Sequence, residues 1–129
     1  MPIERALSSL LASVAGGRRD FGFARDVSAR DGPYLVINRI SAARDYALGG
    51  STGYIASRFQ IDAYAETHAA ARAAAAEVIG VVDGFRGSVQ GTRILGIFIE
   101  SERDLSAADA GQAEHLFRRS VDLIVHHGE

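Results

Sequence analysis

The chain has 129 residues, a formal net charge of −2 at pH 7 and no cysteine. A chain of this length forms one domain that buries roughly two-thirds of its unfolded surface, and the missing cysteines exclude disulfides and cysteine metal sites. The small net charge argues against a general nucleic-acid-binding protein, and no apolar run is long enough to cross a bilayer. We therefore expect one soluble, intracellular domain over residues 1–129.

The first predicted element is an amphipathic helix near the N-terminus. Its apolar residues recur with helical spacing and would form one buried face: Ile3, Ala6, Leu7, Leu10, Leu11 and Val14. Gly16 and Gly17 end this helix. Segment 17–32 has no clear period, so we interpret it as a connection with room for a short strand around residues 21–23.

Two strands are predicted next, at 34–40 and 54–65, because both segments are rich in β-branched and aromatic residues. In the second strand, one side carries Ile55, Phe59, Ile61 and Ala63, and the other carries Arg58, Gln60, Asp62 and Tyr64. Because successive side chains of a strand point to opposite faces, we expect one face to be buried. The other face is expected to be wet or covered by a neighbouring subunit.

The segment between these strands is SAARDYALGGSTG, residues 41–53. Two antiparallel strands can be joined by two residues, so a connection of this length needs a reason. It is polar and contains three glycines, which keep it adaptable, yet it also carries Tyr46 and Leu48. We interpret it as a long, flexible hairpin tip, or arm, that contacts something outside the subunit.

An alanine-rich helix is predicted over residues 66–82. Its inner stripe consists of Ala71, Ala75, Val78, Ile79 and Val82, and it stops at Asp83 and Gly84. The opposite side bears Ala69, Ala73, Ala76 and Gly80, with Arg72 and Glu77 as its charges. A helix that is neutral most of the way round is usually covered on more than one side. In so small a domain, we expect the second cover to be another protein chain.

The last predicted strands are 94–100 and 117–127, the first of which follows a tight turn in GSVQGTR, residues 87–93. The polar segment between them could hold at most one helical turn. The resulting order is α-β-β-α-β-β, which indicates an α+β fold. We expect a mostly antiparallel sheet of four or slightly more strands, packed by two helices and extended by the long hairpin arm.

Residues that could perform catalysis or bind a metal are few. The chain lacks a GxSxG motif, a phosphate-binding loop and a GxGxxG motif. His126 and His127 are adjacent on a strand and point to opposite faces, so we interpret them as ordinary surface histidines near a chain end. Glu100, Glu102 and Asp104 would face one side if the strand continued, and local ion pairs fit them better than a metal.

Arg118 and Arg119 begin the last strand and point to opposite faces of the sheet. One of them must therefore share the core face or lie at its rim. We expect rim placement with Asp104 or Glu102 as the acidic partner, or else an ion pair between subunits.

Several segments occur in an order and spacing typical of one protein family. The most telling are R-D-Y at 44–46 between two strands, Q-I-D-A-Y at 60–64 before the alanine-rich helix, and D-G-F-R-G at 83–87, followed by ILGIFIESERDL and FRRSVDLIV. Over residues 3–126 the chain resembles the small tail-completion proteins of tailed phages, also called tail terminators or minor tail proteins, which also occur in phage-derived particles such as gene transfer agents. Segments 17–32 and 105–115 match this pattern least.

The resemblance implies a structural virion protein of the tail, assembled in the bacterial host cytoplasm. Its members look like α/β subunits that form a six-membered ring at the head-proximal end of the tail tube. The ring ends tube polymerisation and presents a surface to the head–tail connector, while DNA passes through its lumen without specific binding. The resemblance implies no catalysis, no cofactor, no metal and no membrane.

A ring has heterologous interfaces, so each subunit needs two different contact surfaces. We expect contacts with neighbouring subunits or with the tail-tube protein at ten residues: Arg44, Asp45, Tyr46, Leu48, Tyr54, Arg58, Tyr64, Arg72, Arg103 and Arg118. Arginine suits such surfaces because its planar guanidinium makes bidentate pairs and stacks on aromatic rings.

Two alternatives to the tail terminator remain. The first is a head-closure or connector ring component of the same particle, which the sequence separates poorly from a terminator. The second, from a different class, is a small α+β enzyme or ligand-binding domain with its site on the open face of the sheet. That alternative requires polar groups that converge on a pocket, and the sequence contains no such cluster.

Overall fold

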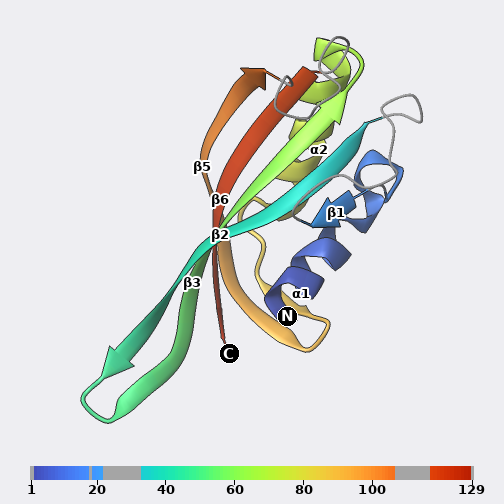
Figure 1. The fold of residues 1–129 in the computed structure, drawn as a ribbon. Helices are drawn as coiled ribbons and strands as arrows, with labels where there is room; N and C mark the ends of the chain where they lie inside the picture. The colour runs from blue at the N-terminus through green and yellow to red at the C-terminus, as the bar shows by residue number, and fades with distance from the viewer. Residues whose placement is uncertain (1, 18, 22–32, 107–116, 129) are drawn as a thin grey trace.

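The computed structural model describes residues 2–17, 19–21, 33–106 and 117–128. Within these residues, two helices, a 3-10 helix and six strands follow one another (Figure 1). They are α1 (Pro2–Leu10), η1 (Leu11–Gly17), β1 (Arg19–Phe21), β2 (Tyr34–Ala47), β3 (Gly50–Ala65), α2 (His68–Val82), β4 (Gly87–Val89), β5 (Thr92–Ser106) and β6 (Phe117–Gly128).

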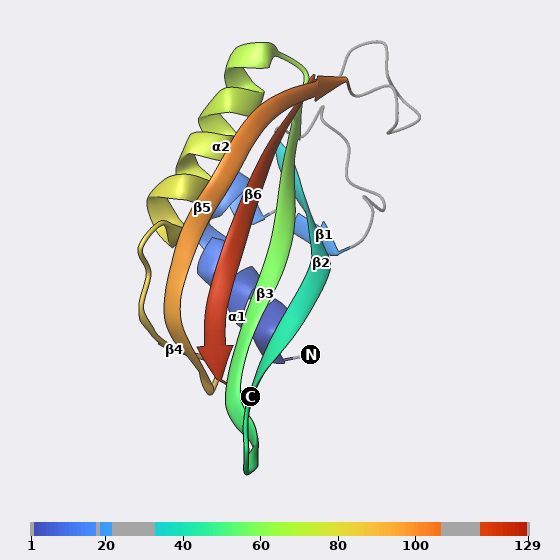
Figure 2. The same cartoon turned by 90° about the vertical axis from the view of Figure 1, so that its left-hand side faces the viewer.

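The strands form one six-stranded sheet in the order β1-β2-β3-β6-β5-β4. All neighbouring pairs are antiparallel except β1 and β2, which run parallel. The two helices lie on one face of the sheet, and Figure 2 shows the opposite face, which neither helix covers. The predicted α+β class, the two helices and the mostly antiparallel sheet are therefore confirmed.

The predicted order α-β-β-α-β-β was incomplete because it left out two short strands and a 3-10 helix. The strands β1 and β4 have three residues each, too few for a clear alternation of apolar and polar side chains. The strand β1 lies close to the short strand allowed for around residues 21–23. The strand β4 occupies the predicted tight turn, in which Gln90 and Gly91 at positive φ link it to β5.

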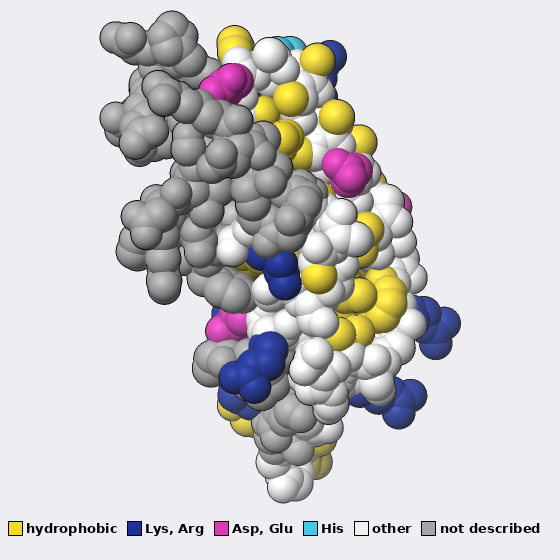
Figure 3. Space-filling view, turned by 90° about the vertical axis from the view of Figure 1, so that its right-hand side faces the viewer, with side chains coloured by type: hydrophobic (Ala, Val, Ile, Leu, Met, Phe, Trp, Pro, Cys, Tyr) yellow, Lys and Arg dark blue, Asp and Glu magenta, His cyan; other side chains and the backbone are white. Residues whose placement is uncertain are grey.

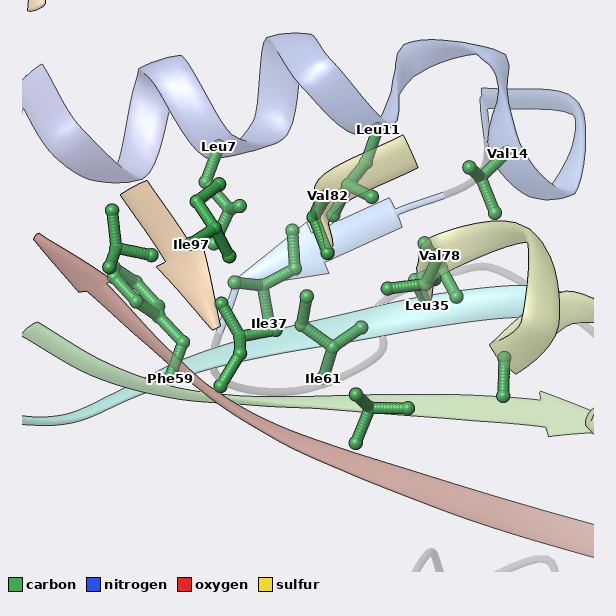
Figure 4. Close-up of a cluster of buried hydrophobic side chains, with 14 of the residues drawn as sticks. Leu7, Leu11, Val14, Leu35, Ile37, Phe59, Ile61, Val78, Val82 and Ile97 are labelled. Atoms are coloured by element: carbon green, nitrogen blue, oxygen red, sulfur yellow. The ribbon is translucent and has the colours of Figure 1, made fainter. Parts of the chain in front are cut away.

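The core lies between the helices and the sheet (Figure 4). Its largest fully buried side chains come from every layer: Leu7 and Leu11 from the N-terminal helices, Leu35 and Ile37 from β2, Phe59 and Ile61 from β3, Val78 and Val82 from α2, Ile94 and Ile97 from β5, and Leu123 from β6. Burying one side chain of this kind stabilises the fold by about 1.5–3 kcal/mol relative to leaving it exposed. The alternation predicted for the second strand is confirmed for this face.

Helix α2 is held at both ends by short-range hydrogen bonds. The side chain of Thr67 accepts a hydrogen bond from the backbone N–H of Ala70, and the N–H of Asp83 donates to the carbonyl of Ile79 over 2.9 Å. Its buried face includes three alanines and two valines, namely Ala71, Ala74, Ala75, Val78 and Val82. Its other side is exposed, and Figure 3 shows apolar side chains scattered over the helical side of the molecule.

The largest departure from the predicted elements is the arm. Segment 41–53 is not a loop, because β2 runs on to Ala47 and β3 begins at Gly50. The two strands pair on both sides of an irregularity at Asp45 and residues 52–54, and they are joined by a two-residue turn, Leu48 and Gly49. The arm is thus a β-ribbon that projects from the sheet (Figure 1). The sequence did not predict strands here, because neither face of the arm is buried. Without a buried face, apolar and polar residues do not alternate along the strand.

Candidate assembly surfaces

The arm (residues 41–53) projects beyond the rest of its own subunit. Every residue of β2 from Ile40 to Ala47 is exposed, Tyr46 is 66% exposed, and Leu48 at the turn is fully exposed. The ladder between β3 and β6 ends at the pair Tyr54 and Gly128, so among the described residues no strand flanks the outer part of the arm. Two large apolar side chains are consequently held in water at the tip.

Asp45 has a structural partner within the arm. A register shift lies between Arg44 and Tyr46, where Asp45 of β2 faces residues 52–54 of β3, so the extra residues of this bulge belong to β3. The hydroxyl of Thr52 donates to the carboxylate of Asp45 over 2.9 Å and also contacts its carbonyl oxygen. This contact connects β2 and β3 at the bulge.

The uncovered face of the sheet carries an aromatic cluster, which the sequence did not reveal because its members lie on three strands. The Tyr54 ring stacks on the His126 ring at 5.6 Å, and the Tyr54 hydroxyl hydrogen-bonds His126 Nδ1. The Phe98 ring meets the same imidazole edge-on at 5.6 Å. Arg58 lies in the same region and pairs with Glu100. Tyr54 and Arg58 therefore lie on the expected outer face.

Further along this face, two of the expected contact residues are largely satisfied within the subunit. Tyr64 is buried and stacks on Tyr34 at 5.2 Å, and burial raises the pKa of Tyr34, so its phenol stays protonated. Arg118 donates to the buried carboxylate of Asp62 over 3.2 Å. Ser120 also hydrogen-bonds that carboxylate. We therefore leave Tyr64 and Arg118 out of the contact surface.

The carboxylates at the end of β5 form ion pairs, as predicted, but they do not share one side. A register shift between Ile99 and Ser101 separates them, so Glu100 reaches Arg58 on the uncovered face. Glu102 and Asp104 instead reach Arg119 on the core face, over 3.1 and 2.9 Å. Arg119 accordingly lies at the rim of the core face with the acidic partners expected of it.

The remaining expected contact residues are exposed. Arg72 lies on the outer side of α2, and Arg103 pairs loosely with Asp122 over 3.5 Å. Within the described part of the chain, no three histidine, cysteine or acidic residues come together in a way that could hold a metal ion. None of the described helices is both long and apolar enough to span a membrane.

Comparison with known proteins decides the family. A family model described as "Tail completion protein gp17" matches residues 5–126. The chain belongs to this tail completion family. Its fold is similar to that of a chain in a solved structure described as "Virion of native gene transfer agent (GTA) particle", with a TM-score of 0.76 and 16% sequence identity over 99% of this chain and 96% of that one. No curated protein matches the sequence.

Membership of the tail completion family makes the chain a structural protein of a phage or phage-like tail. The family is not one of enzymes, which agrees with the small number of chemical motifs in the sequence. The resemblance found from the quoted segments is therefore confirmed over nearly the whole chain.

In this tail completion protein, a series of hydrogen bonds between polar side chains holds the base of the arm. The sequence did not predict this series. Arg39 on β2 donates to Glu4 of α1 and to the hydroxyl of Ser57 on β3, each over 3.1 Å. Ser57 in turn lies 2.7 Å from His127 Nε2, and His127 Nδ1 lies 2.7 Å from the carbonyl oxygen of Gly128. That oxygen only accepts, so Nδ1 carries a proton, and the Ser57 hydroxyl donates to Nε2 of the neutral ring.

His127 is buried, which corrects the expectation of an ordinary surface histidine. The two histidines do point to opposite faces, since His126 lies in the aromatic cluster. One signal could have identified the buried one: His127 falls in phase with Val121, Leu123 and Val125, which are all core residues.

We expect this histidine to make the fold sensitive to acid. Burial lowers the pKa of His127 below its usual 6.5, with Arg39 and Arg44 acting in the same direction and Gly128 and Glu4 opposing them. The unfolded chain therefore binds more protons, and the stability that neutral His127 contributes is lost as the pH falls below about 6.5. The measurement is urea unfolding between pH 8 and pH 5.

The control for this prediction is His68→Gln, at an exposed histidine. The wild type should lose more stability on acidification than His127→Gln, whereas His68→Gln should follow the wild type. Equal acid sensitivity of wild type and His127→Gln would contradict the prediction.

Proposed function

We propose that the protein forms a six-membered ring at the head-proximal end of the tail tube, where it ends tube polymerisation and joins the tail to the head connector. Membership of the tail completion family supports a role at the end of a tail. The single observation that carries the proposal is the arm, which holds Tyr46 and Leu48 in water beyond the reach of its own core. Such a feature gains stability only when another chain covers it.

A ring explains why one subunit carries two different exposed surfaces that could contact neighbouring copies. In a heterologous interface, one surface of each copy meets a different surface of the next, and a closing rotation produces a ring. The arm is one such surface, and the uncovered face of the sheet, bearing Tyr54 and Arg58, is the other (Figure 2). The exposed, mostly neutral side of α2 remains available for the tube or for the connector.

The proposed lumen must let DNA slide. Neutralising many phosphates with basic groups would bind DNA tightly, because each contact releases counterions. The net charge of −2 is compatible with a lining that does not retain DNA.

A head-closure or connector ring of the same particle is the second candidate, because its subunits would need the same paired surfaces. The polar residues at the base of the arm do not support the alternative that the protein is an enzyme. Ser57 and His127 resemble a nucleophile and a base, but both are buried and the Ser57 oxygen already bonds Arg39. A substrate cannot reach them without opening the core.

The experiment that tests the proposal uses assembled tail tubes of the same particle and purified portal-side proteins. The protein should cap one end of each tube with a six-fold ring, visible by electron microscopy, and capped ends should stop growing when tube subunits are added. Binding only to the portal-side proteins, with tubes left free to elongate, would reject the terminator and favour the connector component.

A further inference from the structure

Large apolar side chains are exposed in three places among the described residues. Three of them, Ile40, Tyr46 and Leu48, lie on the arm or at its base, Leu95 and Phe98 lie on β5, and Phe117 begins β6. Phe98 meets His126, whose ring lies on the face of the sheet opposite the buried His127. Neither helix covers this face (Figure 2). The subunit thus carries one apolar projection and, elsewhere, one apolar surface on its sheet.

Phe98 on β5 forms a surface together with Tyr54 on β3 and His126 on β6, and we call these three residues the aromatic platform. Its exposed Phe98 ring is held in place by its neighbours. Phe98 is 57% exposed, yet its ring lies against Gly96, where an added Cβ would come within 3.1 Å of the ring. The imidazole of His126 holds the same ring from the side, with an interplanar angle of 73°. A rigid aromatic group loses little entropy on binding, which is typical of side chains that dominate interfaces.

We propose that the arm tip of one copy docks on the aromatic platform of the next copy, with Tyr46 and Leu48 covering Phe98. This inference rests on the proposed ring and specifies one of its contacts. Each of the two sites carries one basic and one acidic residue. Arg58 and Glu100 border the platform, because Ile124 pairs with Phe98 on one side and with Arg58 on the other. Beside the tip, the arm carries one residue of each sign, Arg44 and Asp45.

The dimensions of the arm suit a contact between copies. The stretch from Ser41 to Leu48 spans roughly 23 Å at 3.3 Å per residue, and four strands span roughly 14 Å. The arm is therefore long enough to cross the four long strands of a neighbour. It cannot fold back on its own platform without losing ladder pairs, which continue to Ala47 and Gly50 at the tip.

Cysteine cross-linking tests this contact directly, because the natural chain has no cysteine. The double variant Leu48→Cys/Phe98→Cys is oxidised at ring-forming concentration, alone and on tail tubes, and run on a non-reducing gel. If the tip docks on the platform, the gel shows a ladder that ends at six subunits, whereas each single variant shows at most dimers.

The matched control places the second cysteine at Phe117 instead of at Phe98. Phe117 is 44% exposed and meets His68 edge-on at 5.7 Å and 73°, so its surroundings closely match those of Phe98. Leu48→Cys/Phe117→Cys should give no ladder. An equal ladder in this control would overturn the proposal.

Failure of the contact and failure of the ring are distinguished by imaging the same samples. Rings without the Leu48–Phe98 ladder reject the docking and leave the ring in place, whereas the absence of rings rejects both. A second measurement covers the case in which the cysteines themselves weaken binding. Phe98→Ala should weaken self-association about tenfold or more, as expected for a central aromatic contact, and Phe117→Ala should leave it unchanged.

Discussion

Replacing Arg44, Asp45 and Tyr46 together by alanine should leave the subunit folded but abolish ring formation and head–tail joining. All three residues are exposed on the outer part of the arm, and the core cluster contains none of them. The free energy of unfolding should therefore change little. The tip, however, loses its aromatic side chain, both charges and the side-chain hydrogen bond between Asp45 and Thr52. Urea unfolding measures the first effect, and electron microscopy of particles measures the second.

The control is a matched triple substitution in another exposed hairpin. Arg86, Ser88 and Arg93 lie on the β4–β5 hairpin or directly before it, are not buried and also include two charges. Alanine at these three positions should leave tails joined to heads at normal length. If particles with the substituted arm had head-attached tails of normal length, the arm would have no role in assembly.

Mixing two defective variants provides a sharper test of the arm as one half of a heterologous contact. A subunit without a working tip still offers its platform, and a Phe98→Ala subunit still offers its tip. A mixture of the two should form heterodimers and stop there, because the outer surfaces of each heterodimer are both defective. Rings assembled from the mixture would show that the tip and Phe98 do not belong to the same contact.

The sequence predicted those parts of the fold in which burial imposes a period. Helix α1, helix α2 and the inner face of β3 each have one side in the core, so their apolar residues recur with spacings that can be recognised. The arm lacked this constraint, and its strands were predicted as a loop. The end of β5 was similarly mistaken for a polar connection, although it pairs with β6 as far as Ser106.

The candidate surfaces were predicted only where a single strand defined them. Tyr46 and Leu48 stood out as apolar residues in a polar segment, and both proved to be exposed. The aromatic platform depends on the register between β3, β6 and β5, including a bulge near Gly96, which no local pattern encodes. The burial of Asp62 with Arg118 depends on pairing between residues 56 positions apart.

That buried pair leads to the largest stability effect expected from a charged residue. In Arg118→Ala, the carboxylate of Asp62 keeps its bonds to Ser120 and Gln60 but loses its cationic partner in a site where its side chain is only 3% exposed. An uncompensated buried charge costs about 3–5 kcal/mol of unfolding free energy. Urea unfolding at pH 7 measures the loss.

The matched control is Arg103→Ala, which removes an arginine that is 51% exposed and lies 3.5 Å from Asp122. Exposed ion pairs contribute about 0–1 kcal/mol, so this variant should unfold nearly as the wild type does. The double variant Asp62→Asn/Arg118→Met should recover much of the loss, because it removes both charges while the amide oxygen introduced at position 62 can still accept from Ser120. Equal losses in the two arginine variants would mean that water reaches Asp62, and that Tyr64 and Arg118 belong to an accessible surface after all.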